Sequence, residues 1–220
     1  MSALIALLLS GWLYQQPVPE NCPEISQTYA EGTSWDFVLT DDKGAVYKTY
    51  QYKVEEVSNE NERLVYAIKY TTLNKKGKEE DKGYRNIIAA ADQYLVNIET
   101  MLVNYNSDKA NYMSLSCNPQ PGDDVPDVRK VTTYTVDNLG QKSYVSNKVN
   151  LTDIEYGERT TITTALGELD CIMLTYKVSF DLQDFTYTDW IDSSFRTVKR
   201  EILDKKGKLA FTGMITTYSN

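Results

Sequence analysis

Two acidic segments hold the residues best suited to chemistry in this chain. Segment 181–192, DLQDFTYTDWID, combines four aspartates with Phe185, Tyr187 and Trp190. Aromatic rings beside carboxylates can bind sugars, and two facing carboxylates can hydrolyse a glycosidic bond. The same alternation is typical of a strand with an exposed acidic side, which is the interpretation that we favour. The four aspartates are Asp181, Asp184, Asp189 and Asp192.

Segment 121–127, PGDDVPD, brings Asp123, Asp124 and Asp127 together. Ca²⁺ requires several oxygen ligands at set positions of a loop. This cluster lacks that spacing, so it indicates a solvated turn, and we expect no metal site.

The chain contains no histidine. This absence removes Ser–His–Asp and Cys–His nucleophilic machinery, zinc bound by histidine and the usual general base near neutral pH. We therefore expect no catalytic residues, no cofactor and no enzymatic activity. A carboxylate-based, carbohydrate-active enzyme is the least favoured of three hypotheses.

The charge balance argues against anionic partners. Lys and Arg total 23 against 31 Asp and Glu, which gives a net charge of −8 and a pI of about 4.7. Nucleic-acid binding depends on clustered cations, and an anionic membrane surface is disfavoured for the same reason. The 17 tyrosines and many threonines favour β-sheet instead.

Four short phrases of the form Asp/Asn-x-x-Gly recur along the chain. Asp or Asn favours the first position of a type I turn, and Gly supplies the left-handed residue that closes such a hairpin. Each phrase therefore predicts a hairpin turn. The four glycines are Gly44, Gly77, Gly140 and Gly207.

The segments beside these phrases alternate with the period of a strand. One face is mostly apolar, as in residues 46–54, 64–70, 172–180, 198–202 and 209–215. This pattern predicts a meander of antiparallel strands with little helix. Residues 85–105 are ambiguous, and we favour strand with a short helix as the alternative. Residues 104–127 contain three prolines and predict a loop.

The N-terminal run SALIALLLSGW, residues 2–12, is too short to span a bilayer. It is typical of the apolar part of an export signal, although no cation precedes it. The part LLLSGW is similar to a bacterial lipobox with Trp12 in place of cysteine, so we expect export without a lipid anchor. The alternative is a buried strand or helix. We assign residues 1–16 to this segment and 17–220 to a single β-rich domain.

Three cysteines are present, Cys22, Cys117 and Cys171, and their spacing matches no metal motif. Exported proteins meet conditions in which disulfides persist. An odd number allows at most one internal bridge with one free thiol. The alternative is that each cysteine is a small buried hydrophobe.

Several phrases in order resemble the TapB-like family of exported envelope domains of unknown function. They are NCPEISQTYAEGTSWDFVLTDDKGAVYKTYQYKV, TTLNKKGKE, PGDDVPD, ERTTITTALGELDCIMLTYKV and VKREILDKKGKLAFTGMITTY. The most specific are Thr-x-x-Gly-x-x-x-Cys at residues 164–171 and the hairpin at residues 198–207. The resemblance runs from about residue 21 to the C-terminus. It implies a strongly curved antiparallel sheet, a half-barrel similar to lipoprotein carriers.

The same resemblance implies a cellular location and a possible disulfide. It implies export to the periplasm or cell envelope of a Gram-negative bacterium. Cys22 and Cys171 match the family pattern, so a disulfide, if present, would join these two. The chain departs from the family where Arg196 replaces a usual Gly and where a cysteine is missing near Ala89 and Ala90.

A curved sheet with one apolar face must cover that face, because large exposed apolar patches are rare. The loop at residues 104–127, an envelope protein or an apolar small molecule could do so. We predict an envelope domain that binds such a ligand or partner on its concave face, in a space of about 300–1,000 Å³. A structural or surface-assembly domain without ligand is the alternative. The predicted lining is Tyr50, Tyr52, Tyr66, Ile68, Leu174, Tyr176 and Val178.

Overall fold

A computed structural model describes residues 29–60, 63–90, 93–98, 111–136, 141–144, 148–180 and 183–219. Within these ranges every extended regular element is a β-strand, which confirms the predicted mainly β class. No helix among the described residues is long and apolar enough to cross a membrane. The predicted N-terminal segment at residues 1–16 lies outside the described residues.

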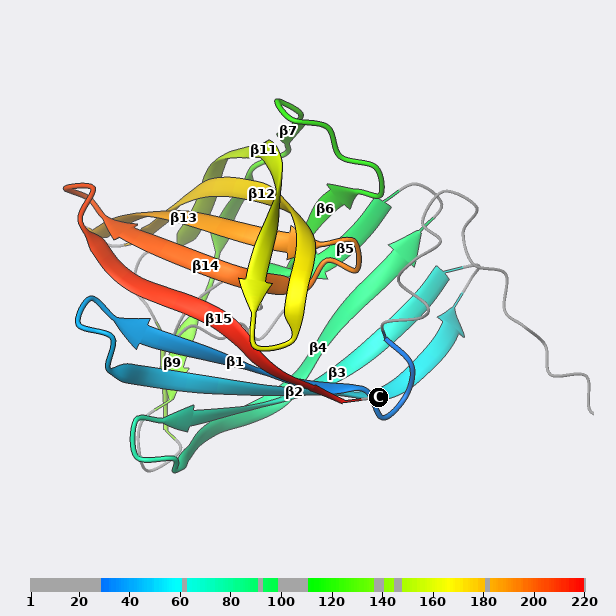
Figure 1. The fold of residues 1–220 in the computed structure, drawn as a ribbon, viewed down its shortest axis with the longest axis horizontal. Coiled ribbons are helices and arrows are strands. Elements are labelled where there is room, and N and C mark those ends of the chain that lie inside the picture. The colour runs from blue at the N-terminus through cyan, green and yellow to red at the C-terminus, as the bar shows by residue number, and fades with distance from the viewer. Residues whose placement is uncertain are drawn as a thin grey trace, which may run out of the picture.

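Most strands follow one another with short connections, whereas β5 and β6 are separated by residues 98–111 (Figure 1). The first eight are β1 (Ser34–Asp41), β2 (Val46–Glu60), β3 (Arg63–Asn74), β4 (Glu79–Ala90), β5 (Gln93–Asn97), β6 (Tyr112–Ser116), β7 (Asp124–Val125) and β8 (Val128–Val131). The others are β9 (Tyr134–Val136), β10 (Lys142–Tyr144), β11 (Val149–Thr164), β12 (Gly167–Phe180), β13 (Gln183–Asp192), β14 (Thr197–Asp204) and β15 (Leu209–Ser219).

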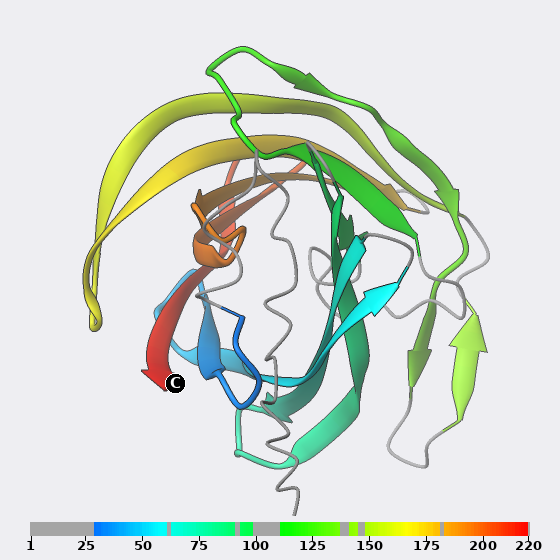
Figure 2. The ribbon, with the colours of Figure 1, turned by 90° about the vertical axis from the view of Figure 1, so that its right-hand side faces the viewer.

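One antiparallel sheet contains most of these strands. Its order is β6-β5-β4-β3-β2-β1-β15-β14-β13-β12-β11-β7, and β8 also pairs with β11. The first and last strands, β1 and β15, pair in the middle of this order. The sheet curls until β6 lies beside β7, so that it nearly closes into a barrel (Figure 2). The predicted curved antiparallel sheet of successive hairpins is confirmed.

The predicted hairpin turns are present wherever the structure describes them. Gly44, Gly77 and Gly207 have φ angles of 79°, 71° and 75°. At the last of these turns, Oδ1 of Asp204 accepts hydrogen bonds from the backbone N–H groups of Lys206 and Lys208 at 2.8 and 3.0 Å. These bonds lower the pKa of Asp204. Gly140 lies outside the described residues.

The regions that the sequence left ambiguous are mostly strand. Residues 85–90 lie in β4 and residues 93–97 in β5, as favoured, whereas residues 91–92 and 99–105 lie outside the described residues. The predicted loop at 104–127 is wrong in part, because it contains β6 and β7. Met113 and Leu115 of β6 are buried against the core, and this burial offsets the cost of ordering a short strand.

Candidate ligand cavity

A small cavity opens on the concave face of the sheet, between the strands β1–β4 and the beginning of β14. The space that can hold the centres of water molecules is about 50 Å³, within an opening of about 650 Å³ that includes solvent at the mouth. The wall is mainly aromatic and aliphatic. Its residues are Tyr29, Trp35, Phe37, Leu39, Tyr50, Tyr52, Ile68, Ile87, Val96, Phe195, Arg196, Thr197 and Arg200.

Strands β1 and β2 provide an aromatic wall. Trp35 is paired with Tyr52 across the two strands, and Phe37 with Tyr50. The rings of Trp35 and Tyr52 stack with centroids 5.2 Å apart, and those of Tyr50 and Tyr52 stack at 6.4 Å. A side chain at Gly213 would place its Cβ 2.3 Å from the ring of Phe37, so this glycine makes room for the wall.

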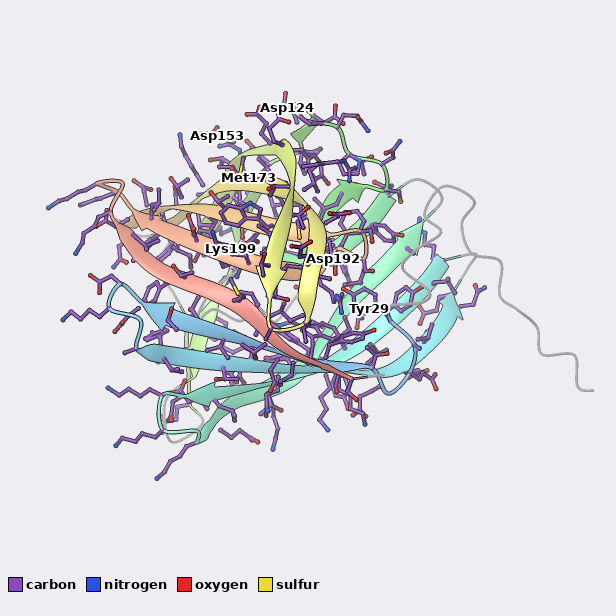
Figure 3. The ribbon with its side chains drawn as sticks, in the orientation of Figure 1. Tyr29, Asp124, Asp153, Met173, Asp192 and Lys199 are labelled. Carbon is purple, nitrogen blue, oxygen red and sulfur yellow. The ribbon has the colours of Figure 1, made fainter. Side chains whose placement is uncertain are left out.

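The turn between β13 and β14 closes another side of the cavity. Oδ1 of Asp192 accepts hydrogen bonds from the backbone N–H groups of Ser194 and Arg196, while Nε of Arg196 donates to Oδ2 at 2.8 Å. These bonds hold Phe195 at a φ of 61°, which is rare for a bulky residue. Its ring packs on Tyr94 with centroids 4.3 Å apart. Tyr29 lies near Asp192 (Figure 3).

Arg200 lines the cavity from β14 and is fully paired with Asp189. Its Nε and Nη2 donate to Oδ1 and Oδ2 of Asp189 at 2.6 and 2.7 Å, and the hydroxyl of Tyr176 donates to Oδ2 at 2.9 Å. Burial by itself would lower the pKa of Arg200, but the charge of Asp189 outweighs it and the pKa lies well above its usual value. Burial raises the pKa of Tyr176.

Arg85 of β4 is a strand neighbour of two residues of the cavity wall, although it is not part of the lining itself, and it differs from Arg200 in its partners. It is opposite Ile68 across β3 and β4, and it precedes Ile87 on the same face of β4; both isoleucines line the cavity. Arg85 is only 4% exposed, and its Nε and Nη1 have no hydrogen-bond partner. Its guanidinium lies over the ring of Tyr70, 4.1 Å from the centroid.

Tyr50 lies within electrostatic range of both arginines. Its hydroxyl is buried without a hydrogen-bond partner. Burial raises the pKa of Tyr50 far above its usual value, and the positive charges of Arg85 and Arg200 oppose that rise. Tyr50 is therefore a neutral hydroxyl that can donate a hydrogen bond.

Three of the seven residues predicted to line a ligand site border this cavity. They are Tyr50, Tyr52 and Ile68. The other four face inward as expected but pack in the core away from the cavity: Tyr66, Leu174, Tyr176 and Val178. The cavity is also smaller than the predicted 300–1,000 Å³. The sequence analysis did not select Phe195, Arg196, Arg200 or Arg85 as site residues.

The acidic segments do not form a free pair of catalytic carboxylates among the described residues. Asp189 is bound to Arg200 and Asp192 to Arg196, while Asp184 is exposed and Asp181 lies outside the described residues. In the second segment, Oδ2 of Asp123 accepts a hydrogen bond from the backbone of Gln120. No group of three or more potential metal ligands is found in the described part of the chain.

The cysteines differ from the predicted pairing. Cys171 is a free, buried thiol, whereas Cys117 is in a disulfide. The predicted Cys22–Cys171 bridge is therefore wrong as far as Cys171 is concerned; Cys22 lies outside the described residues. Burial, and then the nearby Asp192, raise the pKa of Cys171 to about 12, so this thiol stays protonated.

The fold and the cavity define a class of protein: a curved antiparallel sheet that wraps a mainly apolar interior with a small cavity on its concave face. The chain belongs to the DUF3108-like family, whose sequence pattern matches residues 30–213. No match is found among proteins with curated descriptions. The TapB-like resemblance remains a prediction.

Two solved structures share the fold at low sequence identity. One is a "putative lipoprotein" from Parabacteroides distasonis, with 18% identity and a TM-score of 0.72 over 87% of this chain and 96% of that one. The other is a "putative exported protein with YmcC-like fold" from Bacteroides fragilis, with 14% identity and a TM-score of 0.73 over 87% of this chain and 97% of that one.

Proposed function

We propose that this chain is an exported, non-enzymatic domain of the bacterial cell envelope that binds an apolar ligand in the cavity on its concave face. The observation that carries the proposal is the aromatic wall of Trp35, Phe37, Tyr50 and Tyr52 around an open space. Ligand sites are typically concave and mainly apolar, with a few polar groups that orient the ligand. Thr197 and the Nη1 of Arg196, which has no hydrogen-bond partner, supply such groups here.

Two further observations support export. The sequence of residues 2–12 is typical of an export signal. The two similar structures are described as a lipoprotein and an exported protein. Our proposal includes a periplasmic or envelope location in a Gram-negative bacterium, which these observations support only as far as export.

The size of the cavity favours a second candidate function. A space of about 50 Å³ holds only a few water molecules. A structural or surface-assembly domain would need no more than that. A ligand of ordinary size would have to occupy the wider opening and place only one end in the cavity.

Titration with a long-chain alcohol distinguishes these two functions. Dodecanol is an uncharged apolar probe, and the fluorescence of Trp35 in the wall should change as it binds. We expect saturable binding that weakens about tenfold in Tyr52→Ala, because an aromatic ring of the wall is lost. Tyr84→Ala is the matched control, since Tyr84 is 60% exposed. Native mass spectrometry of protein purified from its own envelope should show a co-purifying small molecule. Absence of both signals would favour the assembly domain.

A further inference from the structure

We propose that the ligand is an amphiphile with an anionic end, and that this end enters the cavity first to meet Arg85 and Tyr50. The anionic group is a carboxylate or a phosphate. This inference rests on the proposed function and names the chemical class of the ligand.

The first step is that Arg85 is a buried cation without an anion. It is 4% exposed, and no ion pair is found for it among the described residues. Its Nε and Nη1 also lack hydrogen-bond partners. A buried charge normally has a partner because desolvation costs several kcal/mol per ion. Each such unsatisfied group in a folded protein requires an explanation, and a missing ligand is one.

The second step is that Arg85 is held in place by a specific arrangement. Tyr70 is paired with Gly83 across β3 and β4, and a Cβ at Gly83 would lie 3.0 Å from the Tyr70 ring. The glycine therefore lets the ring lie close to β4. The Tyr70 hydroxyl donates to Oδ2 of Asp81 at 2.9 Å, which fixes the ring, and the guanidinium of Arg85 stacks on it. Asp81 is thus engaged by Tyr70.

The third step is that a second donor lies within electrostatic range of this guanidinium. The Tyr50 hydroxyl is buried and has no partner, and Tyr50 lines the cavity. Ile68 and Ile87, the neighbours of Arg85 across and along the strands, line it as well. A guanidinium edge and a phenol hydroxyl together offer several N–H and O–H donors and no acceptor other than the phenol oxygen. Carboxylates and phosphates are the groups that Arg recognises in two-bond geometry.

The fourth step is that the rest of the molecule does not favour anions. The net charge of −8 repels them on average. The charges of Arg200 and Arg196 are already balanced by Asp189 and Asp192, although the Nη1 of Arg196 has no hydrogen-bond partner. A preference for an anionic ligand would therefore come mainly from the unbalanced charge of Arg85, and the aromatic wall would contact the apolar tail.

The test compares ligands with the same chain length, one with an anionic end and one with an uncharged polar end. The binding of dodecanoate and of dodecanol is measured by calorimetry and by tryptophan fluorescence, at a pH at which the carboxylate is ionised. We expect dodecanoate to bind about tenfold tighter or more, as hydrogen bonds to charged groups suggest. Dodecyl phosphate should share this preference. Acetate and inorganic phosphate should compete only at far higher concentrations, because they lack the tail.

Variants assign the preference to Arg85. In Arg85→Met the two ligands should bind with equal affinity, and the affinity for dodecanol should be the same as in the wild type. Arg63 is exposed, so Arg63→Met should behave as the wild type. The thermal midpoint of Arg85→Met should not fall, because an unpaired buried charge is replaced by an apolar chain of similar length. Should Arg85→Met fail to fold, Tyr50→Phe provides the same test by removing one hydroxyl, and it should reduce the preference several-fold.

The outcomes separate this inference from the function on which it rests. If dodecanol binds as tightly as dodecanoate to the wild type, the anionic end is wrong but an apolar ligand remains. If acetate competes as well as dodecanoate, the tail contributes nothing, and both the amphiphile and the apolar ligand are wrong. If the preference survives in Arg85→Met, or is undiminished in Tyr50→Phe, the assignment to these residues is wrong. If neither long-chain compound binds, the proposed function itself fails.

Discussion

Arg85 and Arg200 occupy comparable positions on two walls of the same curved sheet. Each faces inward from the middle of a strand, and they are 4% and 5% exposed. Arg200 is opposite Asp189 across β13 and β14, whereas Arg85 is opposite Ile68 across β3 and β4. The first arginine is bound through two nitrogens to an aspartate of its own fold, and the second has two guanidinium nitrogens without a partner.

This difference separates a structural ion pair from a candidate recognition group. The set of Arg200, Asp189 and Tyr176 is closed, because both carboxylate oxygens accept hydrogen bonds from within the protein. Such a satisfied network fixes the packing of β12, β13 and β14 and offers little to a ligand. Arg85 has a fixed ring beneath it but no anion, and it therefore retains donors for one.

The largest effect that we expect is on the closed pair. Asp189→Asn keeps the shape of the side chain but leaves Arg200 as an uncompensated buried charge. We expect a loss of about 3–5 kcal/mol in the free energy of unfolding, measured in urea. Asp153→Asn is the control, because Asp153 and Lys177 form an exposed pair that should contribute little. A loss at Asp189 as small as that of the control would contradict the structural role of the pair.

A smaller effect is expected where Gly83 supports the platform under Arg85. Gly83→Val adds atoms against the Tyr70 ring, and overpacking of this kind costs about 1–3 kcal/mol. The displaced ring should also loosen Arg85 and reduce the preference for dodecanoate over dodecanol. Lys82→Val, at the exposed neighbouring position of β4, controls for the β-propensity of valine. Equal stability and equal ligand preference in the two variants would show that Tyr70 is not a required platform.

Local patterns in the sequence predicted most of the sheet. The Asp/Asn-x-x-Gly phrases located the turns at Gly44, Gly77 and Gly207, because a short turn has few chemical solutions. Alternation predicted which residues face inward, including Tyr50, Ile68 and Tyr176. The curvature itself came from the family resemblance. Strand β6 was missed because five residues beside prolines give a weak periodic signal.

The cavity was harder to predict than the sheet. Alternation alone does not distinguish Tyr52, which lines the cavity, from Leu174, which packs in the core. The part played by Phe195 and Arg196 depends on how one turn folds over the concave face, which is a tertiary property. Arg85 did leave a signal, since it is in phase with Ile87 and Ala89 on β4. A cation in phase with apolar residues is easily read as exposed, because Arg is rarely buried without a partner.

The smallest expected difference in stability is between two variants that test whether Arg85 can be given the kind of partner that Arg200 already has. It is also the most direct test of the comparison between the two arginines. Ile68→Asp places a carboxylate opposite Arg85, as Asp189 stands opposite Arg200. Either polar residue at position 68 loses the burial of isoleucine, so Ile68→Asn serves as the reference. With Arg85 present, we expect Ile68→Asp to be more stable than Ile68→Asn by about 1 kcal/mol, from the new ion pair. In an Arg85→Met background the order should reverse, because the carboxylate is then buried without a partner. Urea unfolding of the four proteins measures this coupling directly.

The paired carboxylate in Ile68→Asp should also occupy the donors of Arg85 and abolish the preference for dodecanoate. An unchanged preference in Ile68→Asp, together with no coupling, would mean that Arg85 does not face a site that an anion can reach.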